Sequence, residues 1–286
     1  MIGFIGLGVM GEPICRNLAS KSGKEVCAFD IAPEPLARMK AHRVTPAASV
    51  RELAERSEFV FLSLPGGPAV KEVCVGRASL LMFMRSGTYV IDLSTTPVAL
   101  ARDLQGRFSA RGIHFADAPV ARTRAAAEAG TLSVMVGCAE ADFARIKPLL
   151  AHFASDVTRC GGPGAGQAMK LVNNMVLFQN VVAVAEALAV VRRIGLDPEL
   201  ALQVLAKGSA DSFALREHGM KAMLPDKYPE RAYSVGYALK DLGYALELAK
   251  MARIDLTGAK NAEAVLKRAA AAGHTAEYFP VIAKLI

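Results

Sequence analysis

The sequence predicts an α/β domain built on a doubly wound parallel sheet, followed by a domain made of helices alone. Short apolar runs alternate with helical segments from residue 1 to about residue 160. A glycine-rich stretch then interrupts the chain, and beyond it no segment has the alternation of a strand. The 286 residues are enough for two domains, which we place at 1–161 and 162–286.

Composition excludes several classes of protein. The five cysteines are scattered without C-x-x-C spacing, which favours reduced thiols in a cytoplasmic protein and no bound metal. The N-terminus lacks the pattern of a signal peptide. A net charge of +7 spread along the chain indicates a mild attraction for anionic small molecules and no nucleic-acid partner. The longest apolar run, 171–191, carries polar side chains that argue against a membrane span.

The first element is a buried strand at 2–5 that runs into the pattern G-x-G-x-x-G at 6–11. A helical segment follows at 13–20, and a second strand at 26–29 ends in Asp30, about 20 residues beyond the last glycine. This context is typical of a Rossmann unit that binds a dinucleotide at a helix N-terminus. A carboxylate at this position repels a 2′-phosphate, so we predict NAD rather than NADP. The predicted cofactor contacts here are Gly6, Gly8, Val9, Met10, Gly11 and Asp30.

The next elements continue the α/β alternation. We predict a helix at 36–40, then strands at 58–64, 89–93, 114–120, 132–137 and 157–159, with a helix at 141–153 before the last strand. Leu64 and Thr95 lie at the carboxyl ends of two strands, the edge where parallel sheets bind ligands. For the hydroxyls of 94–96, local sequence favours capping of the next helix over contact with nicotinamide or substrate.

The chemistry is predicted at the glycine-rich hinge and the helix that follows it, at about 168–191. The helix is apolar nearly all round, yet its first turns carry Lys170, Asn173 and Asn174. Residues three and four apart are neighbours on a helix, so Lys170 and the two asparagines can present an ammonium and two amides to one place, where we predict that Asn173 and Asn174 bind substrate. A lysine in a buried helix is costly unless it is paired or used. Further helices are predicted at 199–207, 211–224, 233–253 and 259–272.

Five separate stretches together resemble the β-hydroxyacid dehydrogenases, in that family's order along the chain: 4–11 with Pro13, 92–95, 117–120 with 130–132, 164–174, and 240–242. The resemblance implies a Rossmann domain followed by an all-α domain used for substrate binding and oligomerisation. It assigns Lys170 as the catalytic residue and Asn174 as a substrate ligand. It also places Leu64, Thr95 and Lys240 at cofactor positions, and with the apolar composition it suggests a homodimer or homotetramer.

One departure from the family pattern concerns the substrate. Many members carry Ser-Gly-Gly after Asp-x-Pro-Val, whereas this chain has Ala121-Arg122-Thr123. This loop is similar to that of sulfolactaldehyde reductases. A guanidinium offers a planar fork of donors to an anionic group, so we predict that Arg122 and Thr123 hold a sulfonate, or else a carboxylate or phosphate. The alternative is an arginine that points to solvent.

The predicted reaction is reversible hydride transfer between nicotinamide and the carbinol carbon of a short β-hydroxyacid or its semialdehyde. Lys170 takes or returns the hydroxyl proton, and burial is expected to lower its pKa toward the working range. Alternatives are dehydrogenases of the 3-hydroxyisobutyrate or tartronate semialdehyde type, oxidative decarboxylation of the 6-phosphogluconate type, and a non-catalytic NAD(H)-binding relative. The short C-terminal domain disfavours the decarboxylase. Lys170 disfavours the last alternative and imine reduction, since such relatives replace the lysine.

Overall fold

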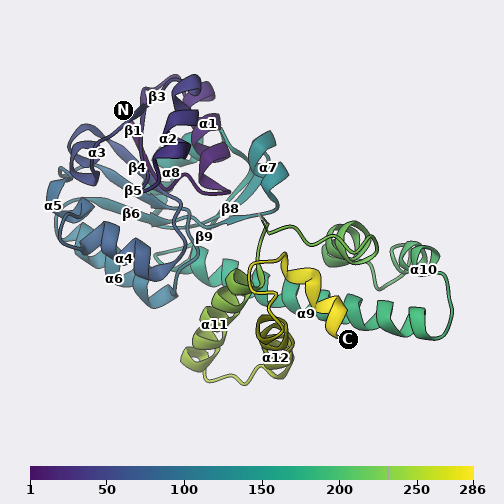
Figure 1. Ribbon diagram of the computed structural model, residues 1–286. Helices are drawn as coiled ribbons and strands as arrows, with labels where there is room; N and C mark the ends of the chain where they lie inside the picture. The colour runs from purple at the N-terminus through teal and green to yellow at the C-terminus, as the bar shows by residue number, and fades with distance from the viewer. Residues whose placement is uncertain (231) are drawn as a thin grey trace. The chain divides into compact units, whose positions relative to one another are not determined.

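The computed structural model describes residues 1–230 and 232–286. The chain divides into two compact units, Met1–Lys170 and Leu171–Ile286. Helix α9, Ala165–Arg193, begins in the first unit and continues into the second (Figure 1). The division falls within this helix rather than at the glycine-rich stretch, and the assignment of 1–161 and 162–286 to separate functions stays a prediction.

A nine-stranded sheet forms the centre of the first unit. Its first six strands are parallel in the order β3-β2-β1-β4-β5-β6, the arrangement of a Rossmann fold. β8 pairs antiparallel with β6 and β7, and β9 pairs parallel with β8. The strands are β1 Ile2–Ile5, β2 Val26–Phe29, β3 Val44–Pro46, β4 Phe59–Leu62, β5 Tyr89–Asp92, β6 His114–Asp117, β7 Val120–Ala121, β8 Leu132–Gly137 and β9 Ala154–Gly161.

Helices cover both faces of this sheet, which is why its central strands read as continuous apolar runs. In β4, Phe59 and Phe61 pack into the core beneath α1, α2, α7 and α8, and Val60 and Leu62 pack into the core beneath α3 to α6. The helices are α1 Gly11–Lys21, α2 Pro33–Met39, α3 Val50–Arg56, α4 Gly67–Val75, α5 Leu80–Phe83, α6 Val98–Ser109, α7 Arg124–Ala129 and α8 Glu140–Leu150.

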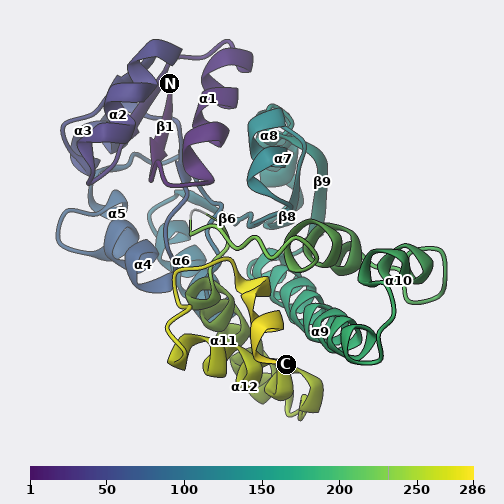
Figure 2. The same cartoon turned by 45° about the vertical axis from the view of Figure 1, so that its right-hand side comes forward.

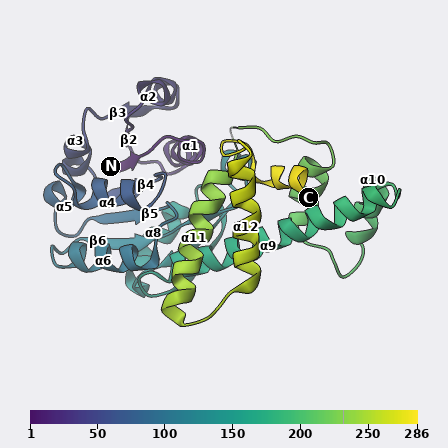
Figure 3. The same cartoon turned by 60° about the horizontal axis from the view of Figure 1, so that its bottom comes forward.

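The described part of the second unit contains helices and one isolated bridge, between Ser234 and Tyr278. α10 lies at the far end of α9 (Figures 1 and 2), and α11 and α12 run side by side (Figure 3). After α9, the elements are α10 Pro198–Leu205, a π-helix Ala214–Met223, α11 Val235–Ala252, α12 Thr257–Ala271 and a 3-10 helix Phe279–Leu285.

The predicted class and element order are confirmed, with differences at the edges of the units. β9 is eight residues long where three were predicted, because its predominantly polar residues hide the strand pattern. Short β3 was missed, as were α3, α4, α5, α7 and the final 3-10 helix, and the predicted strand at 114–120 divides into β6 and β7. α6 was expected only as the helix that follows residues 94–96. Three residues ending in Pro46 give too short a pattern to identify a strand from sequence.

Candidate active site

The glycine loop between β1 and α1 has the geometry that dinucleotide binding requires. Gly6 has a φ of +95°, a conformation that L side chains rarely adopt. A Cβ on Gly11 would lie 2.0 Å from the carbonyl oxygen of Gly6, so helix and loop approach too closely for any side chain. A Cβ on Gly8 would meet nothing within 4 Å. The loop therefore leaves open the space where a pyrophosphate would approach the backbone.

Asp30 lies at the end of β2, beside the same loop. Its Oδ2 accepts a hydrogen bond of 2.5 Å from the Leu7 amide, and its Oδ1 accepts one of 2.8 Å from the Ala32 amide. The carboxylate thus connects the glycine loop to the second strand. Val9 is 41% exposed at the tip of the loop, and Met10 packs against the core. The predicted cofactor residues 6–11 and 30 therefore lie close together in the first unit.

The ends of β4 and β5 are joined by side-chain hydrogen bonds. The Leu64 amide donates to Ser94 Oγ at 2.9 Å, and the Ser94 amide donates to Asp92 Oδ1 at 2.9 Å. The loop that carries Thr95 is thereby held beside Leu64. The expected capping of α6 by this loop was wrong, because Pro97 is the N-cap residue and no side chain caps the helix there. Ser94 Oγ accepts a hydrogen bond from a neighbouring loop instead of from the helix.

Asp117, at the end of β6, anchors the start of α9. Its two oxygens accept the amides of Gly164 at 2.7 Å and Gln167 at 2.8 Å. Burial raises the pKa of Asp117 to about 6, and the backbone N–H groups of Gly164 and Gln167 oppose that rise. A Cβ on Gly166 would lie 2.3 Å from the carbonyl oxygen of Met135, so this turn packs directly against the sheet backbone.

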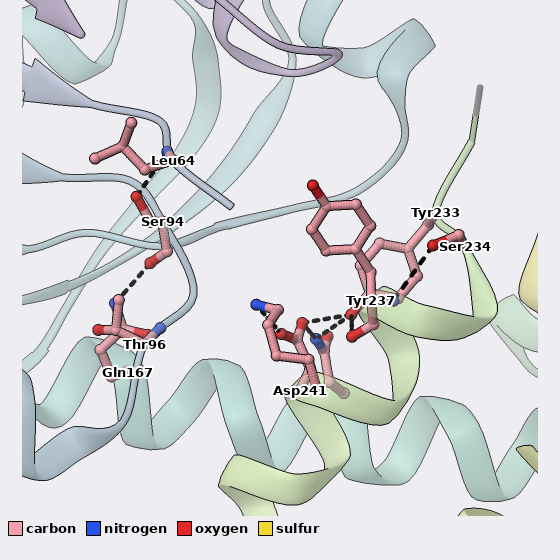
Figure 4. A network of polar contacts seen from close by, with 10 residues as sticks. Leu64, Ser94, Thr96, Gln167, Tyr233, Ser234, Tyr237 and Asp241 are labelled. Carbon is pink, nitrogen blue, oxygen red and sulfur yellow. Dashed lines mark hydrogen bonds and ion pairs between the residues drawn. The ribbon is translucent and has the colours of Figure 1, made fainter. Parts of the chain in front are cut away.

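The first turn of α9 contains a buried polar residue that the sequence analysis missed. Gln167 is 0% exposed, its Nε2 donates to the Ser94 carbonyl at 2.7 Å, and its Oε1 accepts the Thr96 amide at 3.0 Å. Figure 4 shows these contacts beside Leu64. Lys170 lies three residues farther along the helix and is only 9% exposed. Nothing in local sequence distinguishes Gln167 from an ordinary helical glutamine.

Within the second unit, Asn174 belongs to a hydrogen-bonded cluster around Asp241 of α11. Figure 4 shows Asp241 of this cluster beside Tyr233. Asn174 Nδ2 donates to Asp241 Oδ2 at 2.8 Å and to Tyr233 Oη at 3.4 Å, and Tyr233 Oη also donates to Asp241 Oδ2. Lys240 Nζ lies 2.7 Å from Asp241 Oδ1. An ionised carboxylate only accepts hydrogen bonds, so Asn174 must turn its nitrogen toward Asp241.

This cluster brings together a predicted substrate residue, Asn174, and a predicted cofactor residue, Lys240, around one carboxylate that is 1% exposed. Burial, with the nearby charge of Asp241, raises the pKa of Tyr233 well above its usual range. Asn173 is exposed and donates to Asn174 Oδ1 at 3.1 Å. Asp241 lies in the stretch 240–242 that resembles the family, but the sequence predicted no role for it or for Tyr233.

Arg122 does not lie free at the surface. Its Nη1 donates to the Thr131 carbonyl at 2.6 Å and to Ser155 Oγ at 2.7 Å, and its Nη2 contacts Asp156 Oδ2 at 2.5 Å. Its φ is +87°, in the left-handed region that glycine favours. The guanidinium thus holds its own loop to β9.

Thr123, the other predicted substrate residue of this loop, is the N-cap of α7. Its Oγ1 accepts the Ala126 amide at 3.4 Å. The contact is long for a hydrogen bond. Both polar side chains of the predicted substrate loop therefore have partners within the first unit, and their contacts with a substrate stay predictions.

Helix α9 is long and apolar enough, by length and composition alone, to cross a membrane. Its contacts indicate a different role. Gln167 and Asn174 of this helix hydrogen-bond to buried groups of the first and second unit respectively. Polar side chains used in this way are typical of the core helix of a globular protein.

Comparison with known proteins agrees with this geometry. Residues 1–162 match the family of the NAD-binding domain of 6-phosphogluconate dehydrogenase. Residues 164–286 match the family described as NAD-binding of NADP-dependent 3-hydroxyisobutyrate dehydrogenase. The cofactor is therefore a nicotinamide adenine dinucleotide.

Individual relatives are similar over nearly their whole length. The chain is 35% identical over 255 residues to 2-(hydroxymethyl)glutarate dehydrogenase of Eubacterium barkeri, covering 89% of this chain and 84% of that protein. It is 32% identical over 278 residues to 2-hydroxy-3-oxopropionate reductase of Escherichia coli (strain K12), covering 95% and 92%.

Among solved structures, the Mycobacterium tuberculosis 3-hydroxyisobutyrate dehydrogenase with L-serine superposes with a TM-score of 0.90 at 30% identity, covering 99% of this chain and 98% of that chain. The two family models, the named relatives and this superposition agree on one assignment. The chain belongs to the β-hydroxyacid dehydrogenases and is an NAD(P)-dependent oxidoreductase that acts on a CH–OH group.

Proposed function

We propose that Lys170 is the acid–base residue of reversible hydride transfer between the cofactor and the carbinol carbon of a short, anionic β-hydroxyacid or its semialdehyde. The observation that carries this proposal is a lysine only 9% exposed, one turn after the anchored start of α9 and one turn before Asn174. A buried ammonium is costly unless it is paired or used, and this one lies next to the residues assigned to the cofactor and the substrate. The cofactor supplies the hydride acceptor or donor.

The chain's own groups move the proton and orient the substrate. In the oxidative direction Lys170, as the neutral amine, accepts the substrate hydroxyl proton; in reduction its ammonium returns that proton to oxygen. Asn174, held by Asp241 and Tyr233, keeps its carboxamide in one orientation. Asn174 Oδ1 accepts a hydrogen bond from Asn173 Nδ2 through one lone pair. Its second lone pair can accept a hydrogen bond from a substrate hydroxyl.

Two substrate classes suit the loop at 121–123. In the first, Arg122 holds a sulfonate, as in a sulfolactaldehyde reductase. Its ion pair with Asp156 has side chains 40% and 54% exposed, and exposed pairs contribute roughly 0–1 kcal/mol, so a bound anion can replace Asp156. In the second class, the loop binds a carboxylate, as in dehydrogenases of the 3-hydroxyisobutyrate or tartronate semialdehyde type. The contacts of Arg122 with Ser155 and Asp156 of β9 favour this second class.

A spectrophotometric assay with NADH or NAD⁺ separates these classes. The panel is sulfolactaldehyde, dihydroxypropanesulfonate, 3-hydroxyisobutyrate, tartronate semialdehyde, serine and 4-hydroxybutyrate. If Arg122 binds substrate, the sulfonates turn over fastest and Arg122→Ala lowers kcat/KM roughly 30-fold. This corresponds to a loss of about 2 kcal/mol of transition-state stabilisation. Asp156→Asn is the matched control, because it releases the guanidinium without removing it. Equal losses in both variants, with a carboxylate substrate fastest, would show that Arg122 only tethers the loop.

The choice of cofactor and the assembly are part of the proposal. Asp30 at the end of β2 favours NAD, since its charge repels a 2′-phosphate, and comparison of NAD⁺ with NADP⁺ in the same assay tests this. We also propose a cytoplasmic homodimer or homotetramer. Large apolar side chains are exposed around the end of α9 and on α10, namely Val190, Ile194, Leu196, Leu200 and Val204. Light scattering that finds a monomer would contradict the proposed oligomer.

A further inference from the structure

Gln167 connects two parts of the first unit that the proposed reaction requires together. Its carboxamide bonds the backbone of Ser94 and Thr96 through both polar atoms, at 2.7 and 3.0 Å. At 0% exposure it has no water to replace these partners. The side chain therefore pairs backbone groups of the Ser94–Thr96 loop as a backbone peptide group would.

The loop held by Gln167 carries Thr95, a predicted cofactor contact, between the two bonded residues. Ser94 is fixed on its other side, because its Oγ accepts the Leu64 amide and its own amide donates to Asp92. The hydrogen bonds thus run without a break from the end of β4, through the loop after β5, to the first turn of α9 (Figure 4).

The helix side of this connection is equally constrained. Asp117 accepts the Gln167 amide at 2.8 Å, and Gly166 packs against the carbonyl oxygens of Met135 and Asp117 without room for a Cβ. Lys170 follows Gln167 by three residues on the same helix, so it lies on the neighbouring turn and the same face. A shift of the Gln167 turn relative to the loop would displace Lys170 relative to Thr95.

We propose that Gln167 is a positioning residue that keeps the Ser94–Thr96 loop and Lys170 in one fixed register. This proposal rests on the proposed function, since it assigns Thr95 to the cofactor and Lys170 to proton transfer. Displacement of reacting groups by about 1 Å can reduce a rate about 100-fold. Loss of the Gln167 contacts is therefore expected to act on kcat and on cofactor affinity together.

The experiment compares wild type, Gln167→Met, Gln167→Glu and the control Thr96→Val. Thr96 Oγ1 is buried and has no hydrogen-bond partner, so Thr96→Val changes the same loop without breaking the Gln167 contacts. The readouts are NADH affinity by fluorescence, kcat for NADH-dependent reduction of tartronate semialdehyde, and melting temperature. Gln167→Met is expected to lower kcat at least 10-fold and weaken NADH binding at least 3-fold, while Thr96→Val changes neither.

Gln167→Glu provides a readout that a purely structural role would not change. As a carboxylate it faces the Ser94 carbonyl without a proton, whereas the protonated acid donates to that carbonyl as the amide does. The ratio of its kcat to that of wild type should therefore rise as the pH falls from 8 to 5. If Gln167→Met does not fold, this pH-dependent recovery decides the question.

The outcomes separate this proposal from the proposed function. If wild type turns over none of the panel substrates, the proposed function fails, and NADH affinity alone tests whether Gln167 positions the loop. If wild type is active but Gln167→Met and Gln167→Glu match Thr96→Val in kcat and NADH affinity, the positioning role is overturned. A lower melting temperature with unchanged kcat and affinity would also overturn it.

Discussion

At the scale of single residues, Asp241 is a buried charge at the centre of the hydrogen-bonded cluster of the second unit. It receives hydrogen bonds from Asn174 and Tyr233 and pairs with Lys240, although it is 1% exposed. Removing one partner of such a group leaves the others with buried polar atoms unsatisfied. The cluster therefore stabilises the fold and orients Asn174 at the same time.

Two substitutions measure how much this cluster contributes. Tyr233→Phe keeps the packing of the ring against Phe178 and Phe279 and loses only the hydroxyl, so the free energy of unfolding should fall by about 1–3 kcal/mol. Asp241→Asn should cost more, because it also removes the charge beside Lys240. Urea denaturation followed by circular dichroism measures both. An Asp241→Asn protein as stable as wild type would contradict this account of the cluster.

At the scale of elements, the glycine loop before α1 allows fold and cofactor binding to be tested separately. Gly11→Ala places a Cβ 2.0 Å from the Gly6 oxygen, and overpacking of this kind costs about 1–3 kcal/mol of unfolding free energy. Gly8→Ala meets no atom within 4 Å and should leave stability within about 0.5 kcal/mol of wild type. Its methyl group should nevertheless weaken NADH binding at least 10-fold, measured by fluorescence titration. Unchanged NADH affinity in Gly8→Ala would place the pyrophosphate elsewhere.

The π-helix Ala214–Met223 predicts a pH dependence of stability. Its His218 is 4% exposed, and burial lowers the pKa of the imidazole from 6.5 to about 4. Its Nδ1 lies 2.6 Å from Tyr278 Oη, and in the protonated ring both nitrogens can only donate hydrogen bonds. The folded state disfavours the protonated form, so this stabilisation is present above pH 6.5 and is lost as the pH falls toward 4.

The magnitude follows from the same two pKa values. Between pH 7 and pH 5 the unfolding free energy should fall by roughly 2 kcal/mol through His218. The raised pKa of Asp117 acts in the opposite direction, since its stabilisation is lost as the pH rises through about 6. The difference between wild type and His218→Gln therefore isolates the histidine. Equal pH dependence of the two proteins, measured by urea denaturation, would refute the prediction.

At the scale of the whole molecule, the sequence predicts those features of the fold that are encoded by a local pattern of residues. Strands buried on both faces are continuous apolar runs, and the glycine spacing at 6–11 identifies the loop before α1. Contacts between distant residues follow no local pattern. Asn174 and Asp241 are 67 residues apart, Gln167 and Ser94 are 73 apart, and Arg122 and Asp156 are 34 apart. These pairings orient the candidate site, and only the fold reveals them.

The central claim, that Lys170 transfers the proton in NAD-dependent turnover, is tested most directly by Lys170→Ala. The variant and wild type are compared for NADH affinity and for turnover of the best substrate of the panel. Loss of a general acid–base group should reduce kcat by about 100- to 10,000-fold, while NADH affinity stays within a few-fold of wild type. Turnover retained by a Lys170→Ala protein that still binds NADH would contradict the account.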